Sequence, residues 1–427
     1  MKGIRTQNCA HEKIAGCLPY ILVLLPVITV ITRAACSAMT YDESYTYLCY
    51  ALALSDHVSP GMLKELYLDS VANNHLLNTA LIAAVTRLTG VRFCEFVVRL
   101  PVLASGVFYY IFLARCRSKG SVSWIEFTLL AFSYYLNEFF GLARGYGMCA
   151  ALVFFALIHF RKYLSDNSPG DIWICLFTLI CSAYANSVSL LILFSVLTVT
   201  AVRLIVQKDF FAFLQRSMVQ IALCIIPVLL ILIYHFRVSD IEKGMPLFRT
   251  DRAGFIFYIR EYVFLATHDS RFPSALYWLL GIGAGLSTIF MLFKARLKGC
   301  GLAVTFFVHI LVMLAIVFVF KRGTFLQRLL IPSYPLAVMG GGELVHGMHA
   351  QLKARLQFPA RCAGIAHALL LALFLCSFLG HVDLLHTRDW YDDYRIRDLY
   401  MNGVERTDPN PCWDFYELQK QFRQKGL

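Results

Sequence analysis

The sequence predicts an all-α, polytopic membrane protein, and two observations lead to that prediction. Of the 427 residues, 58% are hydrophobic and only 15% are charged, a balance unlike that of soluble globular domains. Long runs without Asp, Glu, Lys or Arg lie between Lys13 and Arg33, between Arg271 and Lys294, and between Lys298 and Lys321. Each run is long enough to cross a ~30 Å hydrocarbon core as a helix.

The first apolar segment, 21–31, is predicted to be an uncleaved span. It resembles a secretory signal followed by "RAACSA", but Arg33 stands just before the small residues, which does not fit a cleavage site. The 14 cysteines include no C-x-x-C pair, so neither a zinc cluster nor a redox motif is indicated.

The excess of basic residues, a formal net charge of +12, indicates cytoplasmic loops rather than nucleic-acid binding. Counting every apolar stretch as a span gives about twelve and leaves Arg115 outside, against the positive-inside rule. If Leu76–Gly90 instead lies along the outer membrane surface, the count is about eleven, within about ten to thirteen, and the short basic loops become cytoplasmic. We adopt this second count, which also makes the N-terminus cytoplasmic.

One region decides the topology downstream. The uncharged run between Asp171 and Arg203, about 31 residues long, must form two short helices that turn near Asn186 and Ser187, since one long helix would reverse every later span.

The predicted domain organisation is a membrane domain, 1–380, followed by a short polar tail, 381–427. Four segments then share the extracytoplasmic face with the tail. They are the first loop 36–95, the turn 142–146, the second large loop 237–272 and the segment 321–328.

The stretch "MTYDESYTY" places two adjacent carboxylates where the chain leaves the first span. Thr40 and Glu43 fit a capping box, and Asp42 would lie in the first helical turn, where the helix dipole favours an anion. This structural interpretation accounts for both carboxylates without any function.

Other polar groups are predicted on the same face. Asn73, Asn74 and His75 precede the surface-lying segment, and Arg99 lies about one turn into a span, where a charge is costly and often marks a functional site. The alternative for Arg99 is a side chain that extends to the outer interface.

Outer arginines run against the positive-inside trend. Arg144 is followed by Gly145, which permits close backbone approach, and by Tyr146. Lys321, Arg322 and Arg328 add to the same face, and less specific candidates are Arg252, Arg260 and Arg271. Because arginine binds phosphate oxygens bidentately, a binding role is expected.

Carboxylates and arginines beside lipid suit the transfer of a group from a phosphate-linked donor. One carboxylate can take a proton from an acceptor hydroxyl, and cations can stabilise the departing phosphate. Outside the cytoplasm the donor must be a lipid that carries an activated sugar.

The ordered motifs "YDESYTY", "NNHLLNT", "VVRLPVLASG", "LARGYGM" and "QRLLIPSYP" resemble the GT-C class of integral membrane glycosyltransferases, closest to the protein O-mannosyltransferase and aminoarabinose transferase branch. The resemblance covers 40–163 well and 321–335 loosely. It implies cell-envelope glycosylation in the plasma or inner membrane, by inverting transfer from a polyprenyl-phosphate sugar to a glycan, lipid or protein acceptor. It further implies Asp42 as base, Glu43 as its partner, and a substrate site of Asn74, His75, Arg99, Arg144, Tyr146, Arg322 and Arg328.

Two departures matter. Leu76 replaces a proline that often follows the histidine, and Asn74-His75 stands where the aminoarabinose branch has an acidic-lysine pair, which argues against lipid A modification. The sequence indicates no definite cofactor, and a divalent metal at Asp42, Glu43 or His75 stays open. So do a lipid or solute transporter and a non-catalytic scaffold.

Overall fold

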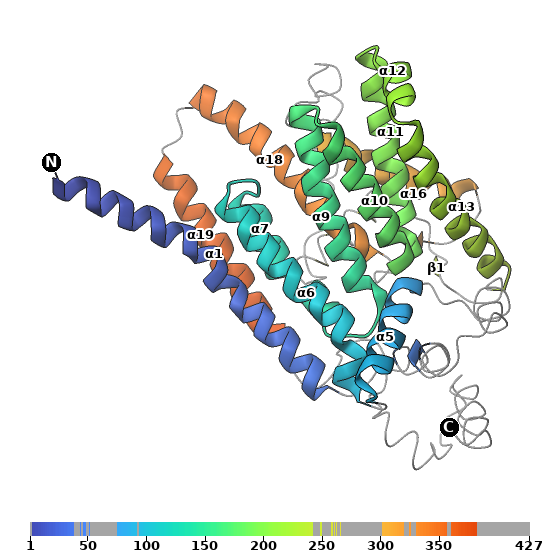
Figure 1. Cartoon of the computed structure of the whole chain (residues 1–427). Coiled ribbons are helices and arrows are strands. Elements are labelled where there is room, and N and C mark those ends of the chain that lie inside the picture. The colour runs from blue at the N-terminus through green and yellow to red at the C-terminus, as the bar shows by residue number, and fades with distance from the viewer. Residues whose placement is uncertain are drawn as a thin grey trace.

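The computed structural model describes residues 2–37, 75–91, 94–241, 301–319, 330–356 and 360–381, together with isolated residues between 43 and 51, between 248 and 265, and at 324 and 325. These residues are almost entirely helical (Figure 1). The first helices are α1 (Lys2–Cys36), α5 (Leu76–Thr89), α6 (Glu95–Ser118), α7 (Trp124–Ala131), α8 (Tyr134–Phe140), α9 (Gly145–Asp166) and α10 (Pro169–Ala185). They are followed by η3 (Ser187–Ser189), α11 (Leu190–Val206), α12 (Phe210–Arg216), α13 (Met218–Ile241), α16 (Gly301–Val319), η5 (Ile331–Ser333), α18 (Tyr334–Leu356) and α19 (Ala360–His381).

Within the described residues, four helices are long and apolar enough to cross a membrane. These spans are Gly16–Cys36, Glu95–Ser118, Gly145–Asp166 and Ser187–Val206. A fifth candidate joins α12 to α13 across a bend of 82°. The predicted helical membrane class is therefore supported, while the count of about eleven spans stays a prediction.

The predicted turn between Asp171 and Arg203 is confirmed. Helix α10 ends at Ala185, the short η3 follows, and α11 begins at Leu190. Asn186 stabilises the turn because its Oδ1 accepts a hydrogen bond of 3.0 Å from the backbone N–H of Val188.

The helices form a bundle with two distinct ends (Figure 1). Helix α1 packs along α6, and α9 packs between α10 and α6. We call one end the Ala143 end, because α1 ends there and α5, α6 and α9 begin around the irregular chain before Gly145. At the other, the Arg161 end, α6 and α9 terminate and α7, α10 and α16 begin.

The short helices α7 and α8 form one bent passage through the bundle, broken at Phe132 and Ser133. The break removes the intrahelical donors that the carbonyls of Leu129 and Leu130 would otherwise have. Buried tyrosines replace them, since the Tyr334 hydroxyl donates to Leu129 O (2.9 Å) and the Tyr109 hydroxyl donates to Leu130 O (3.2 Å). Irregular backbone in an apolar bundle is thus satisfied by neighbouring helices.

At the Arg161 end, the Arg161 side chain lies between the carboxylates of Glu126 and Glu343 and contacts both. Arg161 Nη2 contacts Glu126 Oε1 at 2.5 Å, and its Nε lies 3.3 Å from Glu343 Oε1. The other oxygen of Glu343 accepts from the backbone N–H groups of Leu302 (2.8 Å) and Ala303 (3.2 Å), which are unpaired donors of the first turn of α16. One carboxylate of α18 therefore connects α9 to the start of α16.

Two described residues of the second large loop pair with two of the segment 321–328, which was predicted to share a face with that loop. In an antiparallel ladder, β1 (Phe248–Arg249) places Phe248 opposite Phe325 and Arg249 opposite Thr324 of β2 (Thr324–Phe325). The following η5 contacts α9 and also η3, which lies at the Ala143 end.

Candidate functional site

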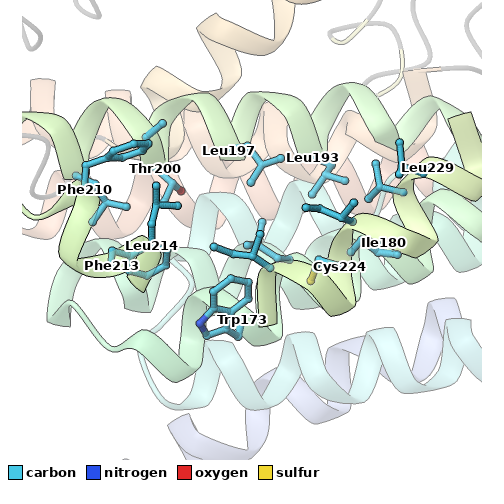
Figure 2. A pocket seen from close by; sticks show the side chains of 16 residues that line it. Trp173, Ile180, Leu193, Leu197, Thr200, Phe210, Phe213, Leu214, Cys224 and Leu229 are labelled. Atoms are coloured by element: carbon cyan, nitrogen blue, oxygen red, sulfur yellow. The ribbon is translucent and has the colours of Figure 1, made fainter. Parts of the chain in front are cut away.

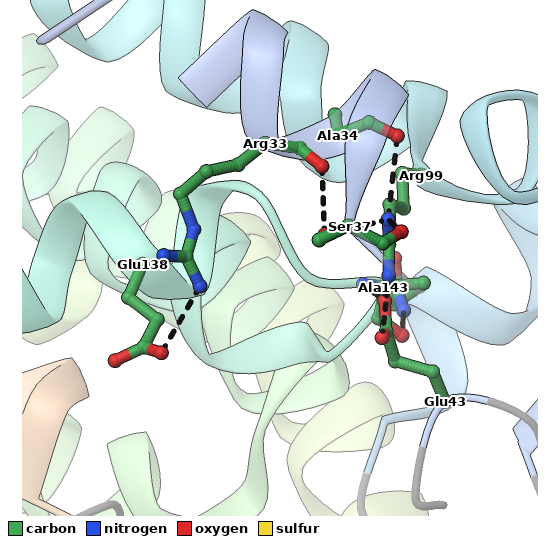
Figure 3. A network of polar contacts seen from close by, with 8 residues as sticks. Arg33, Ala34, Ser37, Glu43, Arg99, Glu138 and Ala143 are labelled. Atoms are coloured by element: carbon green, nitrogen blue, oxygen red, sulfur yellow. Dashed lines mark hydrogen bonds and ion pairs between the residues drawn. The ribbon is translucent and has the colours of Figure 1, made fainter. Parts of the chain in front are cut away.

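Arg99 and Glu43 form a fully buried ion pair at the Ala143 end. Arg99 lies one turn into α6, as predicted, and both side chains are 0% exposed. Its Nε donates to Glu43 Oε1 and its Nη2 to Oε2, each at 2.9 Å (Figure 3). This two-pronged geometry is the strongest form of the arginine–carboxylate contact. The alternative of an arginine that extends to the interface is wrong, because the guanidinium does not reach the surface.

The third nitrogen of Arg99 holds the end of α1. Arg99 Nη1 donates to the carbonyl of Ser37 (2.7 Å), to its hydroxyl (3.0 Å) and to the carbonyl of Ala34 (3.3 Å). The last carbonyls of a helix have no intrahelical donor and carry partial negative charge, so a cation there is favourable. Arg99 thereby links α6, the end of α1 and Glu43.

Glu43 and Asn78 hold the peptide groups of Ala143 from both sides. Glu43 Oε1 accepts from the Ala143 N–H at 2.5 Å, and Asn78 Nδ2 donates to the Ala143 carbonyl at 2.9 Å. Both side chains are 0% exposed. We call this arrangement the Ala143 clamp. Because it satisfies a donor and an acceptor in irregular chain, it fixes the backbone immediately before Arg144.

His75 and Tyr146 pack together beside the clamp. His75 precedes α5, is 2% exposed, and places its Nδ1 3.0 Å from the carbonyl of Ala185 at the end of α10. A carbonyl only accepts, so Nδ1 carries a proton and donates it to this contact. The Tyr146 ring meets the imidazole edge-on, with centroids 4.8 Å apart.

Arg144 differs from the other charged residues of this site that the structure describes, because it is only partly buried. Its guanidinium lies over the Tyr146 ring, 5.8 Å from the centroid, which is within cation–π range. With Glu43 and Arg99 neutralising each other, Arg144 is the accessible positive charge of the described cluster.

Gly145 is required by this geometry, as the sequence predicted for close backbone approach. A Cβ there would lie 2.0 Å from the Ala185 carbonyl oxygen and 2.7 Å from His75 Nδ1. We expect Gly145→Ala to separate α9 from the end of α10 and to destabilise the fold by about 1–3 kcal/mol. Thermal unfolding in detergent measures this. Gly341→Ala is the matched control, since nothing lies within 4 Å of its Cβ; equal melting temperatures for the two variants would contradict the prediction.

A second buried pair was missed by the sequence analysis. Arg33 Nη2 lies 3.1 Å from Glu138 Oε1, and both side chains are 1% exposed. Arg33 was interpreted only as evidence against signal cleavage. Glu138 lies in the last turn of α8 and contacts Arg33 in the last turn of α1 (Figure 3). Asn78 was missed too, although a single amide within the apolar helix α5 was a usable signal.

The structure brings Glu43, His75, Arg99, Arg144 and Tyr146 to one end through these contacts. The other predicted site residues, Asp42, Asn74, Arg322 and Arg328, lie outside the described residues, as does Thr40 of the predicted capping box. Their assignments stay predictions.

No protein family, curated protein or solved structure was found to match the chain. The family resemblance therefore rests on the sequence motifs alone. In the part of the chain that is described, no three His, Cys, Asp or Glu side chains gather to hold a metal ion. Asp42 is not in that part, so the metal alternative stays open.

Proposed function

We propose that this protein is a membrane glycosyltransferase. In this proposal it moves a monosaccharide from a polyprenyl-phosphate-linked donor to an acceptor hydroxyl on the extracytoplasmic face, with inversion. The Ala143 end would face that side, in agreement with the positive-inside distribution of the loops.

The Ala143 clamp carries the proposal. It holds Arg144 in position through Glu43, and Asp42 is the residue directly before Glu43 in the sequence. In this proposal, a carboxylate that can act as a base and a partly accessible guanidinium would both lie at the Ala143 end of the bundle. Since Glu43 already binds Arg99 and Ala143, we assign it a positioning role and leave the proton transfer to Asp42.

The proposed step transfers one sugar and one proton. The acceptor oxygen attacks the anomeric carbon from the face opposite the phosphate, and the bond from that carbon to the phosphate oxygen breaks. The hydroxyl proton passes to the Asp42 carboxylate. The bonding electrons stay on the leaving polyprenyl phosphate, whose growing negative charge Arg144 stabilises, together with Arg328 in this proposal.

Lipid retention tests the donor class. We expect the purified wild type to retain a polyprenyl phosphate, with or without its sugar, and the Arg144→Ala/Arg328→Ala variant to lose it, because two phosphate-binding cations are removed. Mass spectrometry of co-purified lipids measures this. Arg87→Ala, which removes an exposed arginine of α5, is the control and should retain the lipid. Equal retention in all three proteins would contradict the donor assignment.

Two features favour a second candidate, a lipid or solute transporter. Transporters are often built on discontinuous helices with buried charges, and this bundle contains the α7–α8 break and the buried Arg33–Glu138 pair. Flux into proteoliposomes would identify that function. The glycosyltransferase proposal is preferred because the partly accessible charge at the site belongs to Arg144, and arginine is a residue type suited to binding phosphate.

A further inference from the structure

An apolar cavity lies between α10, α11, α12 and α13, toward the Arg161 end. Its volume is about 380 Å³, within the range of small-molecule sites. The side chains that line it are hydrocarbon or thiol, apart from the Thr200 hydroxyl and the indole of Trp173 (Figure 2). It is distinct from the residues of the candidate active site.

The lining selects a hydrocarbon ligand. A polar molecule would lose its hydration in this cavity without gaining hydrogen bonds, at a cost of several kcal/mol. An empty cavity is also unfavourable, because its walls lack partner atoms for dispersion contacts. The adjacent α13 exposes Leu223 (68%), Ile226 (62%) and Leu230 (52%), as a helix in contact with lipid does. Lipid chains are therefore the molecules beside this cavity.

Helix α12 closes one end of the cavity and has the features of an interfacial helix. It is bent by 82° from α13, so it lies across the axis of that span. Phe210, Phe213 and Leu214 line the cavity, and the Phe213 ring stacks on Trp173 with centroids 5.8 Å apart. An apolar face with aromatic residues at the end of a span is typical of the membrane interface.

The charges beside α12 indicate which lipid headgroup fits. Lys208 and Asp209 precede the helix and Arg216 ends it; both cations are exposed, whereas the Asp209 carboxylate is partly buried. Arg203, by contrast, is buried and donates to the carbonyl of Leu164 at 2.8 Å and to Asn167 Oδ1 at 2.5 Å. The two exposed cations favour a headgroup with net negative charge.

We propose that the cavity holds one acyl chain of an anionic phospholipid whose phosphate lies beside Lys208 and Arg216. This lipid would belong to the leaflet opposite the proposed sugar donor. By filling the space between α11 and α13, it would join the α12–α13 pair to the rest of the bundle.

Two tryptophan substitutions on neighbouring positions of α11 test the proposal. Ala201 lines the cavity, whereas Val202 does not and is 50% exposed. We expect added phosphatidylglycerol to raise the melting temperature of the wild type and of Val202→Trp, and to leave that of Ala201→Trp unchanged. Phosphatidylcholine should give no comparable rise. Lys208→Ala/Arg216→Ala should remove the preference for phosphatidylglycerol.

A crosslinking measurement on the wild type does not depend on these variants. Phosphatidylglycerol with a diazirine in its acyl chain, in phosphatidylcholine nanodiscs, should label peptides that cover 193–204 and 221–229. The proposal is overturned if these peptides are unlabelled, or if phosphatidylglycerol stabilises Ala201→Trp as well as the wild type. It is also overturned if Ala201→Trp releases a polyprenyl phosphate instead of a phospholipid.

Discussion

Replacing Asp42 with Asn is expected to abolish sugar transfer and to leave the protein folded. Asparagine has nearly the same shape as aspartate but cannot take a proton from the acceptor hydroxyl. Loss of a general base lowers the rate by about 10²–10⁴-fold. The assay follows a labelled sugar from a polyprenyl-phosphate donor to the acceptor, and the melting temperature of the same preparation reports the fold.

Asp166→Asn is the matched control for this substitution. Asp166 ends α9 at the Arg161 end and is exposed, so its loss should change neither transfer nor stability. Full activity in Asp42→Asn would eliminate the proposed mechanism. Absence of transfer in the wild type as well, with an unchanged cellular phenotype in Asp42→Asn, would support a scaffold instead.

The largest expected effect on stability comes from Arg99→Met. The substitution keeps an apolar chain of similar length but removes the guanidinium, so the buried Glu43 carboxylate retains the Ala143 N–H and loses its bidentate partner. Breaking a buried ion pair from one side typically costs about 3–5 kcal/mol. Unfolding of the purified protein in detergent should show a large fall in melting temperature, whereas Arg87→Met on the exposed side of α5 should have an effect within about 0.5 kcal/mol.

The double variant Arg99→Met/Glu43→Gln separates charge from shape. The amide oxygen of the introduced glutamine can still accept from the Ala143 N–H, but no unpaired charge remains in the interior. We therefore expect the double variant to be more stable than Arg99→Met alone, which gives a large coupling energy in the double-mutant cycle. Purely additive losses would show that the pair contributes packing rather than charge compensation.

The positions of several elements could be predicted from the sequence because they depend on local patterns. The turn at Asn186 and Ser187 follows from a run too long for one helix. Helix α5, Leu76–Thr89, coincides with the segment predicted up to Gly90, which ends the helix with a positive φ of 66°. Arg99 lies one turn into α6 as expected.

The side-chain partners could not be predicted in the same way. Arg99 and Glu43 are 56 positions apart, and Arg33 and Glu138 are 105 apart. Their pairing depends on which helix faces pack together, and no local pattern encodes that choice. The capping interpretation of Glu43 used only its near neighbours, whereas the carboxylate contacts α6 and the chain before α9.

The break between α7 and α8 was also missed. Ser133 is a helix N-cap, with its hydroxyl accepting from the Leu136 N–H at 3.4 Å, but it stands within an apolar run that suggests a continuous span. The break is satisfied by Tyr109 and Tyr334, one before it and one far after it in the chain, so only the assembled bundle makes it favourable.

The order of the residues in the Arg99 network has a consequence for membrane insertion. A ribosome completes Ser37 and Glu43 before it makes Arg99, and Ala143 emerges last. When α6 enters the bilayer, its arginine can therefore meet an acidic partner and the open carbonyls of α1 that are already in place. A solitary arginine costs about 2.5–3.5 kcal/mol at the bilayer centre on insertion scales, which is an upper limit for Arg99 one turn into α6. Early pairing would spare the nascent chain that barrier, and the later arrival of Ala143 would close the assembly.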